Sequence, residues 1–249
     1  MNPDLSVSYK HDFEKFLKHT DEKAILVSEI EKYISRYDIR SVLDIGAGNG
    51  EISIPLSKKV DRYLAIEKNP EFTLQLTQGG VETMEAEFPV QVVGAFDMVL
   101  ASHTISYRRS DFSTFIKEFV QTAWNLVNEN GIFLMIGSGG NNDDWYNLMK
   151  EIGEATELEP NKLGYQETTE QLHAIGKVTV EKVAAYVRTE TLEDMIDALT
   201  FIAGKGDPVR KEKFLRHRDV TESILTEKYA TADGFAFPFY HYFHLIQKN

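Results

Sequence analysis

Apolar residues in the N-terminal part of the chain recur at the spacing of amphipathic helices. This period of about 3.6 residues predicts helices over residues 8–18 and 21–36. Thr20 or Asp21 can cap the start of the second helix. The first part of the chain is therefore predicted to be helical.

The period then shortens, and compact apolar runs alternate with helical candidates. The runs that predict strands are 41–45, 62–67, 96–101 and 131–137. The intervening helices are predicted near 50–59, 70–78 and 111–128. Such an alternation indicates βαβ units and a parallel sheet that is covered on both faces.

The rest of the chain mixes helices and strands. Helices are predicted near 142–152, 167–175 and 191–203, strands near 177–187 and 238–247, and a charged helical stretch over 207–227. No repeat or linker interrupts the pattern. A single α/β domain with helical additions is the simplest interpretation.

Composition and charge exclude several classes of function. Asp and Glu number 39 against 27 Lys and Arg, and the resulting net charge of −12 repels polyanions. We therefore expect no nucleic-acid partner, and instead a small-molecule acceptor that can be cationic. The absence of cysteine excludes disulfides, thiolate catalysis and Cys-ligated zinc, and the seven histidines show no metal-ligand spacing. No metal site is predicted.

Hydropathy also bears on localisation. No apolar run reaches 18 residues, so we expect no membrane span and no membrane partner. The first residues, MNPDLSVSYKHDFEKF, lack the basic flank and apolar core of a signal peptide. We expect a cytoplasmic protein, with no signal in the sequence for an oligomeric state.

The most informative segment carries glycines at positions 46, 48 and 50 directly after the first predicted strand. Glycines there allow a tight turn and bring a ligand against bare backbone. The second strand ends at Glu67, where an acid can accept bonds from both hydroxyls of a ribose. The dinucleotide fingerprint is not met, because Glu51 stands at its third glycine position, which disfavours a nicotinamide or flavin oxidoreductase.

Residues 42–51 together with 63–67 resemble the first two motifs of class I S-adenosylmethionine-dependent methyltransferases. Residues 81–88, 96–103 and 126–131 resemble the segments that follow in that family, in the same order. The resemblance implies a Rossmann-like, mostly parallel seven-stranded sheet with flanking helices, and S-adenosyl-L-methionine as cofactor. Its cofactor-binding positions correspond to Asp44, Gly46, Gly48, Gly50, Glu67, Glu87, Phe88 and Ser102. Glu87 would face the adenine amino group, with Glu85 as the alternative.

The flanks resemble one branch of that family, the histamine N-methyltransferase-like enzymes of small molecules, over residues 9–22 and after the fifth strand. This implies an N-terminal helical lid (1–38), a cofactor-binding core (39–140) and a C-terminal half (141–249) with helical additions in one domain. The substrate-lining candidates are Tyr9, Phe13, Glu22, His103, Tyr107 and Trp145. His103 and Met149 depart from the branch, which has Gln and Trp at those positions.

The expected reaction is methyl transfer to a small-molecule acceptor, with an amine nitrogen favoured. Glu22 would orient a cationic group, and His103, at the exit of a parallel strand, is the candidate catalytic group that takes the proton. The alternatives are an O- or carboxyl methyltransferase and a non-catalytic S-adenosylmethionine-binding regulator. The fourth strand ends in Ala-Ser-His-Thr, which lacks the Asn/Asp-Pro-Pro-Tyr motif of adenine or glutamine methyltransferases.

Overall fold

The computed structural model describes residues 15–106, 109–138, 143–154, 159–204 and 207–248, with no side chains described for 159–161. The chain divides into two compact units. The sheet unit comprises Lys23–Gly140, Pro160–Val183 and His241–Asn249. The helical unit comprises Met1–Glu22, Asn141–Glu159 and Ala184–Tyr240. The predicted single domain, with its three parts, stays a prediction.

The strands form one mixed sheet in the order β3-β2-β1-β4-β5-β8-β6, and the short β7 pairs with β8. Their bounds are β1 Ser41–Ile45, β2 Arg62–Glu67, β3 Glu82–Glu85, β4 Phe96–Ser102, β5 Val127–Gly137, β6 Val178–Thr189, β7 Ala230–Thr231 and β8 Gly234–Gln247. Strands β1 to β5 run parallel, and β8 is antiparallel to β5. The α/β Rossmann-like class is confirmed, but the predicted seven strands are wrong: β7 is an eighth strand, two residues long.

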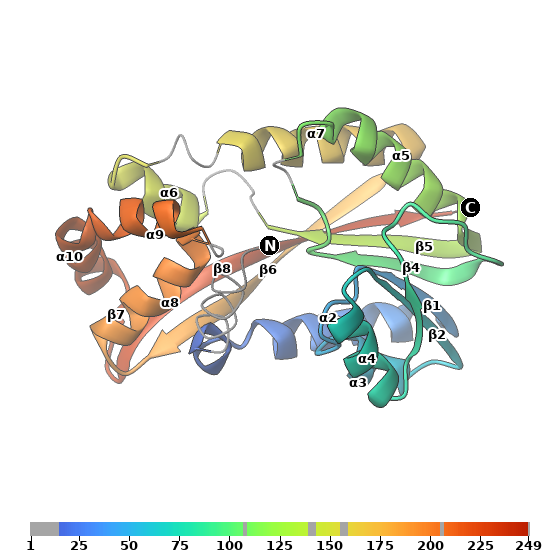
Figure 1. The fold of residues 1–249 in the computed structure, drawn as a ribbon, viewed down its shortest axis with the longest axis horizontal. Helices are drawn as coiled ribbons and strands as arrows, with labels where there is room; N and C mark the ends of the chain where they lie inside the picture. The colour runs from blue at the N-terminus through green and yellow to red at the C-terminus, as the bar shows by residue number, and fades with distance from the viewer. Residues whose placement is uncertain (1–14, 107–108, 139–142, 155–158, 205–206, 249) are drawn as a thin grey trace. The chain divides into compact units, whose positions relative to one another are not determined.

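Helices cover both faces of the sheet in the sheet unit (Figure 1). Their bounds are α2 Glu22–Arg36, α3 Ser53–Ser57, α4 Pro70–Gln78, α5 Phe112–Asn125 and α7 Glu159–Ile175. On one face, Val42 of β1 and Leu100 of β4 share a core cluster with residues of α2, α3 and α4. On the other face, Leu43 and Val99 pack with residues of α5 and α7. Successive strand residues thus enter opposite cores, as the pleat of a strand requires.

The helical unit has a core of its own. Its helices include α6 Asp144–Glu151, α8 Leu192–Gly204, α9 Pro208–Leu215 and α10 Arg218–Lys228, and a further short helix lies over residues 15–19. Phe16 stacks on Phe201 of α8 at a centroid distance of 5.2 Å, and both belong to the cluster that holds this unit together.

Two predicted helices differ from the structure in an informative way. The helix predicted near 50–59 covers only Ser53–Ser57. Pro55 lies in its first turn and has no N–H to bond to Glu51 O, so the regular hydrogen bonding is interrupted there, although Ile54 N still bonds to Gly50 O at 2.9 Å. The stretch predicted over 207–227 is two helices, α9 and α10, with the break at Arg216 and His217.

Asp97, at the start of β4, ties three parts of the sheet unit together. Its Oδ2 accepts bonds from Arg40 N, Ser41 N and Ser41 Oγ at 3.0, 2.8 and 2.9 Å. Its Oδ1 accepts a bond from Asn128 Nδ2 at 2.9 Å. Burial alone would raise the pKa of Asp97, but the bonds from Asn128, Ser41 and Arg40 outweigh it, so the pKa lies below its usual value. The carboxylate therefore stabilises the fold while it is charged.

We predict that Asp97→Asn lowers the free energy of unfolding by about 1.5–3 kcal/mol at neutral pH, the range for bonds to a charged group. Because the folded pKa is depressed, this contribution is present above the unfolded value of about 3.9 and is lost as the pH falls through the folded value. The difference from the wild type should therefore shrink in acid. Urea unfolding at several pH values measures it.

The matched control is Asp61→Asn, which removes an exposed carboxylate that lies 4.0 Å from Arg40. That variant should unfold like the wild type, since exposed ion pairs contribute little. A loss for Asp97→Asn that equals the control, or one that does not depend on pH, would contradict the role given to Asp97.

Candidate functional site

The chain leaves β1 through a glycine turn with left-handed backbone angles. The φ angles of Gly46, Gly48 and Gly50 are 73°, 61° and 86°, values that residues with a Cβ rarely adopt. A Cβ on Gly46 would lie 2.5 Å from Thr104 Cγ2, whereas a Cβ on Gly48 would meet nothing within 4 Å. The turn is therefore tight at Gly46 and opens into free space at Gly48.

Glu67 lies beside this turn, at the end of the neighbouring strand. Its Oε2 accepts a bond from Gly48 N at 2.9 Å, and its Oε1 accepts one from Asn69 N at 2.8 Å. The side chain is 8% exposed. Because a carboxylate has about four acceptor positions, two of them remain for further donors. The predicted acid is thus held in place by backbone on both sides.

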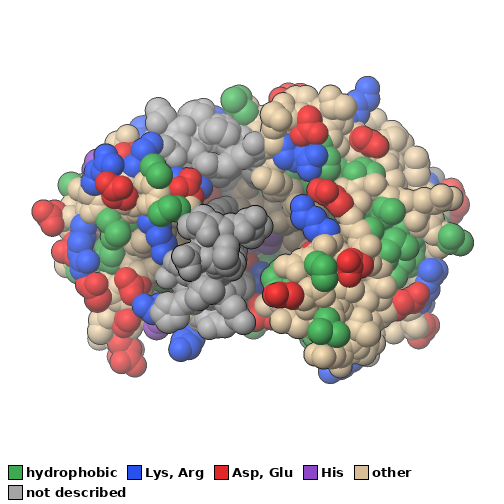
Figure 2. Space-filling model, in the orientation of Figure 1, with side chains coloured by type: hydrophobic (Ala, Val, Ile, Leu, Met, Phe, Trp, Pro, Cys, Tyr) green, Lys and Arg blue, Asp and Glu red, His purple; other side chains and the backbone are tan. Residues whose placement is uncertain are grey.

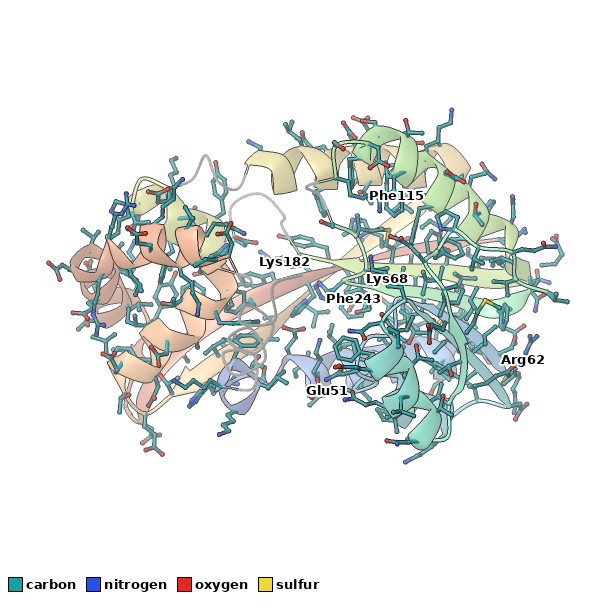
Figure 3. The ribbon with its side chains drawn as sticks, in the orientation of Figure 1. Glu51, Arg62, Lys68, Phe115, Lys182 and Phe243 are labelled. Carbon is teal, nitrogen blue, oxygen red and sulfur yellow. The ribbon has the colours of Figure 1, made fainter. Side chains whose placement is uncertain are left out.

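A cavity of about 270 Å³ opens next to Glu67. Its lining residues come from the ends of β1, β2, β3 and β4 and from α5: Ile45, Gly46, Ile66, Glu67, Lys68, Ala86, Glu87, Phe88, His103, Thr104, Ser106, Arg109, Phe115 and Phe119. Figure 3 labels two of them, Lys68 directly after β2 and Phe115 on α5. Five predicted site residues, Gly46, Glu67, Glu87, Phe88 and His103, are brought together here.

One wall of the cavity is aromatic. Phe88 and Phe119 meet edge to face with centroids 5.1 Å apart, and Phe115 lies 5.6 Å from Phe119. Phe115 and Phe119 are one helical turn apart on α5, so both face the sheet. The apolar wall and the carboxylate of Glu67 together suit a ligand with a flat apolar part and hydroxyl groups.

Cations surround Glu87 at the edge of the cavity. Its Oε1 lies 3.2 Å from Lys68 Nζ and 3.5 Å from Arg109 Nη1. The Arg109 guanidinium lies 4.0 Å from the centroid of the Phe115 ring. Glu85, the alternative position, pairs with Glu67 in the β2–β3 register and does not line the cavity. Sequence reasoning missed Lys68, whose place directly after β2 was the available signal, and Arg109, which lies in the connection between β4 and α5 and had no such signal.

Asp44 supports the site from the core instead of lining the cavity. It is 3% exposed, and its Oδ2 accepts bonds from Ser53 Oγ at 2.6 Å and Tyr63 Oη at 2.7 Å. Burial raises the pKa of Asp44, although both bonds oppose the rise. The pair of bonds connects β1 to α3 and β2. Ser102, at the end of β4, has a buried hydroxyl oxygen with no hydrogen-bond partner among the described residues.

His103 directly follows β4 and has a φ of 54°. Its backbone N–H donates to Ile136 O at 2.9 Å, which ties it to the end of β5. Its Nε2 lies 3.0 Å from Nδ1 of His241 on β8. The sequence indicated no role for His241, because 138 positions separate the two histidines and only the sheet order brings them together.

Of the remaining substrate candidates, Glu22 and Trp145 are described, and neither is a lining residue of the cavity. Tyr9, Phe13 and Tyr107 lie outside the described residues. Trp145 belongs to the helical unit, where its ring packs against Phe214, Phe237 and Phe239 with centroids 6.1, 6.5 and 6.0 Å away. Glu22 begins α2, and its N–H donates to Thr20 Oγ1 at 3.2 Å. Substrate contacts of Glu22 and Trp145 stay predictions.

Three wider features concern the described residues as a whole. In the described part of the chain, no group of three or more acidic or histidine side chains could hold a metal ion. The helices within the same ranges are all too short or too polar to cross a bilayer. Acidic and basic side chains are intermixed over the face shown in Figure 2.

Comparisons with known proteins were made at the level of sequence and of structure. The sequence matches no protein-family model and no curated protein. The YcgJ protein from Bacillus subtilis is structurally similar, with a TM-score of 0.56 at 13% identity over 88% of this chain and 97% of that one.

Two plantazolicin methyltransferases are similar over nearly the whole chain. BpumL, solved with a pentazolic desmethylPZN analog and SAH, has a TM-score of 0.53 at 13% identity, covering 100% of this chain and 92% of that one. BamL, solved with a triazolic desmethylPZN analog and SAH, has a TM-score of 0.52 at 14% identity, covering 99% and 90%. The chain therefore shares its fold with methyltransferases.

We predict that Gly46→Ala and Gly48→Ala differ in stability although both glycines have positive φ. The angle alone costs a side chain about 1–2 kcal/mol, which both variants should lose. Gly46→Ala should lose about 1–3 kcal/mol more, because its methyl group collides with Thr104, whose Oγ1 is held by Ile45 O at 2.6 Å. Urea unfolding of both variants measures the difference, and equal losses would contradict the close contact.

Proposed function

We propose that the protein transfers a methyl group from S-adenosyl-L-methionine to a small-molecule acceptor. The observation that carries the proposal is the Glu67 carboxylate, held by Gly48 N and Asn69 N at the cavity with acceptor positions to spare. The fold shared with BpumL and BamL, both solved with SAH, supports the same cofactor.

The residues present fit this cofactor. Glu67 would accept the two ribose hydroxyls, and the open space at Gly48 would admit the ligand against bare backbone. Phe88 and Phe119 would enclose the adenine ring. Glu87 would reach the adenine amino group only by sharing its carboxylate with Lys68 and Arg109. The buried hydroxyl of Ser102 could then gain a partner.

The bound cofactor supplies a methyl group already activated by its sulfonium, so the chain has to align the acceptor and exclude water. Alignment of this kind is worth on the order of 7–11 kcal/mol of barrier. His103 lines the cavity and is the candidate group that takes the acceptor's proton, since an imidazole can act as a general base.

An amine nitrogen is the proposed acceptor atom. The resemblance of residues 9–22 to small-molecule N-methyltransferases supports it, with Glu22 as the carboxylate for a cationic group. The net charge of −12 also favours cations in the long-range field. An oxygen or carboxylate acceptor, or cofactor binding without transfer, are the alternatives that the experiments below separate.

We predict that S-adenosylhomocysteine binds the wild type and that Glu67→Gln weakens this binding about ten- to hundredfold. Loss of bonds to a charged group, about 1.5–3 kcal/mol, corresponds to that change. Isothermal titration calorimetry measures both affinities. A melting curve without ligand shows how much of the loss is structural, because Gln also disturbs the bond from Gly48.

The matched control is Glu71→Gln, which removes an exposed carboxylate in the first turn of α4 that does not line the cavity. Its affinity should equal that of the wild type. Tight binding of NADH without binding of S-adenosylhomocysteine would overturn the proposed cofactor.

For the acceptor, we predict that Glu22→Gln raises KM for an amine several-fold and leaves the affinity for S-adenosylhomocysteine unchanged. The substitution keeps the shape and removes the charge that would pair with a cation. Initial rates with a panel of amines, phenols and carboxylic acids measure this. If the KM of the variant equals that of the wild type, or if phenols react faster than every amine, the proposed nitrogen acceptor is wrong. The proposal of a methyltransferase would still stand. Transfer to no member of the panel despite tight binding would favour the regulator.

A further inference from the structure

Two histidines from distant parts of the chain form a hydrogen-bonded pair beside the cavity. His103 Nε2 and His241 Nδ1 are 3.0 Å apart, within the range of an N–H···N hydrogen bond. Their rings are nearly perpendicular, with an interplanar angle of 82° and centroids 5.0 Å apart. One nitrogen of each ring therefore takes part in the contact, and the two ring planes are twisted nearly perpendicular to each other.

The sheet order produces this pair. Strand β5 lies between β4 and β8, and neighbouring strands are about 4.8 Å apart, so β4 and β8 are separated by about 10 Å. His103 N bonds to Ile136 O at the end of β5, and the β5–β8 register pairs Gly137 with Tyr242. The two imidazoles thus reach toward each other across the end of β5.

The two members of the pair have different surroundings. His103 is exposed and lines the cavity, at a backbone φ of 54° that few residues with a side chain adopt. His241 is 3% exposed and is not among the residues that line the cavity. A ligand in the cavity would therefore touch His103, whereas His241 would act only through its contact with His103.

We infer that His241 is a positioning residue for proton transfer by His103. In this arrangement His241 Nδ1 accepts the hydrogen of His103 Nε2, which leaves Nδ1 of His103 as its basic nitrogen. The inference rests on the proposed function, in which His103 takes the acceptor's proton. It adds a buried partner that sets the tautomer and the ring orientation of that base, a task commonly performed by the second hydrogen bond of a functional histidine.

The reaction balances without any further reactant. The acceptor's lone pair forms a bond to the methyl carbon, and the electron pair of the carbon–sulfur bond passes to sulfur. The acceptor's proton moves to Nδ1 of His103, and the resulting imidazolium later releases it to water. While His103 is charged, its bond to neutral His241 is charge-assisted and stronger, so the pair stabilises the protonated base.

The chain offers matched variants of His241. Asn places an amide oxygen near the position of Nδ1 and can still accept a bond, whereas Leu has a similar branch without a polar atom. His244, on the same strand and equally buried at 3% exposed, bonds to Tyr165 Oη at 3.1 Å instead of to His103. His244→Leu is therefore the control for loss of a buried histidine from β8.

The first experiment uses the protein alone. Nitrogen NMR of ¹⁵N-histidine-labelled protein, at a pH about two units above the reference pKa of about 6.5, should show a scalar coupling between His103 Nε2 and His241 Nδ1 with the hydrogen on Nε2. His241→Asn should keep the His103 tautomer and His241→Leu should release it, while His244→Leu leaves it unchanged. Absence of the coupling, or a hydrogen on His241 Nδ1, would overturn the inference.

The second experiment measures turnover with an acceptor that the wild type methylates from the amine, phenol and carboxylic acid panel. His241→Leu should lower kcat about ten- to hundredfold, with unchanged affinity for S-adenosylhomocysteine, and His241→Asn should recover most of the loss. Added to His103→Gln, the Leu substitution should have no further effect, because its role acts through His103. Additive losses, or equal rates for the Asn and Leu variants, would overturn the inference.

These results separate the inference from the function on which it rests. Failure of S-adenosylhomocysteine to bind would reject the methyltransferase proposal, whatever the NMR coupling shows. Binding and turnover that persist in His241→Leu at the wild-type rate would reject only the role of His241.

Discussion

The parallel alignment of β1, β2 and β4 is the constraint on which the site depends. Ile45 pairs with Ile66 and Asp44 with Leu100, so these strands end at one edge of the sheet. The glycine turn, Glu67 and His103 all follow directly from those ends. Backbone groups beyond the strand ends no longer bond to a neighbouring strand. One of them, Gly48 N, donates a hydrogen bond to the Glu67 carboxylate instead. The parallel register of the strands is therefore enough to bring the glycine turn, Glu67 and His103 to the same end of the sheet.

Two carboxylates, buried Asp44 and partly buried Asp97, hold this edge and the opposite one in place. Asp44 sits in the core behind the glycine turn and receives the hydroxyls of Ser53 and Tyr63. At the other end of the strands, Asp97 receives Ser41 and Asn128. Each acid is expensive to desolvate unless its oxygens are bonded, so each selects one arrangement of the segments around it. These contacts fix the positions of β1 and β4, whose ends line the cavity, although neither acid lines it.

Much of this was predictable from local patterns. The strands over 41–45 and 62–67 and the helix over 70–78 are confirmed to the residue, since apolar runs and their period are local signals. The glycine turn and Glu67 were found because the residues of that turn are close in sequence and the acid ends the next strand. The helix after the turn is shorter than its apolar pattern predicts because Pro55 interrupts its hydrogen bonding, and the two-residue β7 is too short to leave a periodic pattern.

Sequence alone therefore determined the α/β class and the acid beside the glycine turn, because the apolar runs, the helical periods and the turn are local patterns. Only the tertiary structure decided which side chains share the cavity wall and which histidines meet. His241 lies on β8, and its contact with His103 exists because β8 inserts antiparallel beside β5. Strand order is set by packing of the whole sheet and leaves no local mark in the sequence, so a pair formed across β5 could be seen only after the chain had folded.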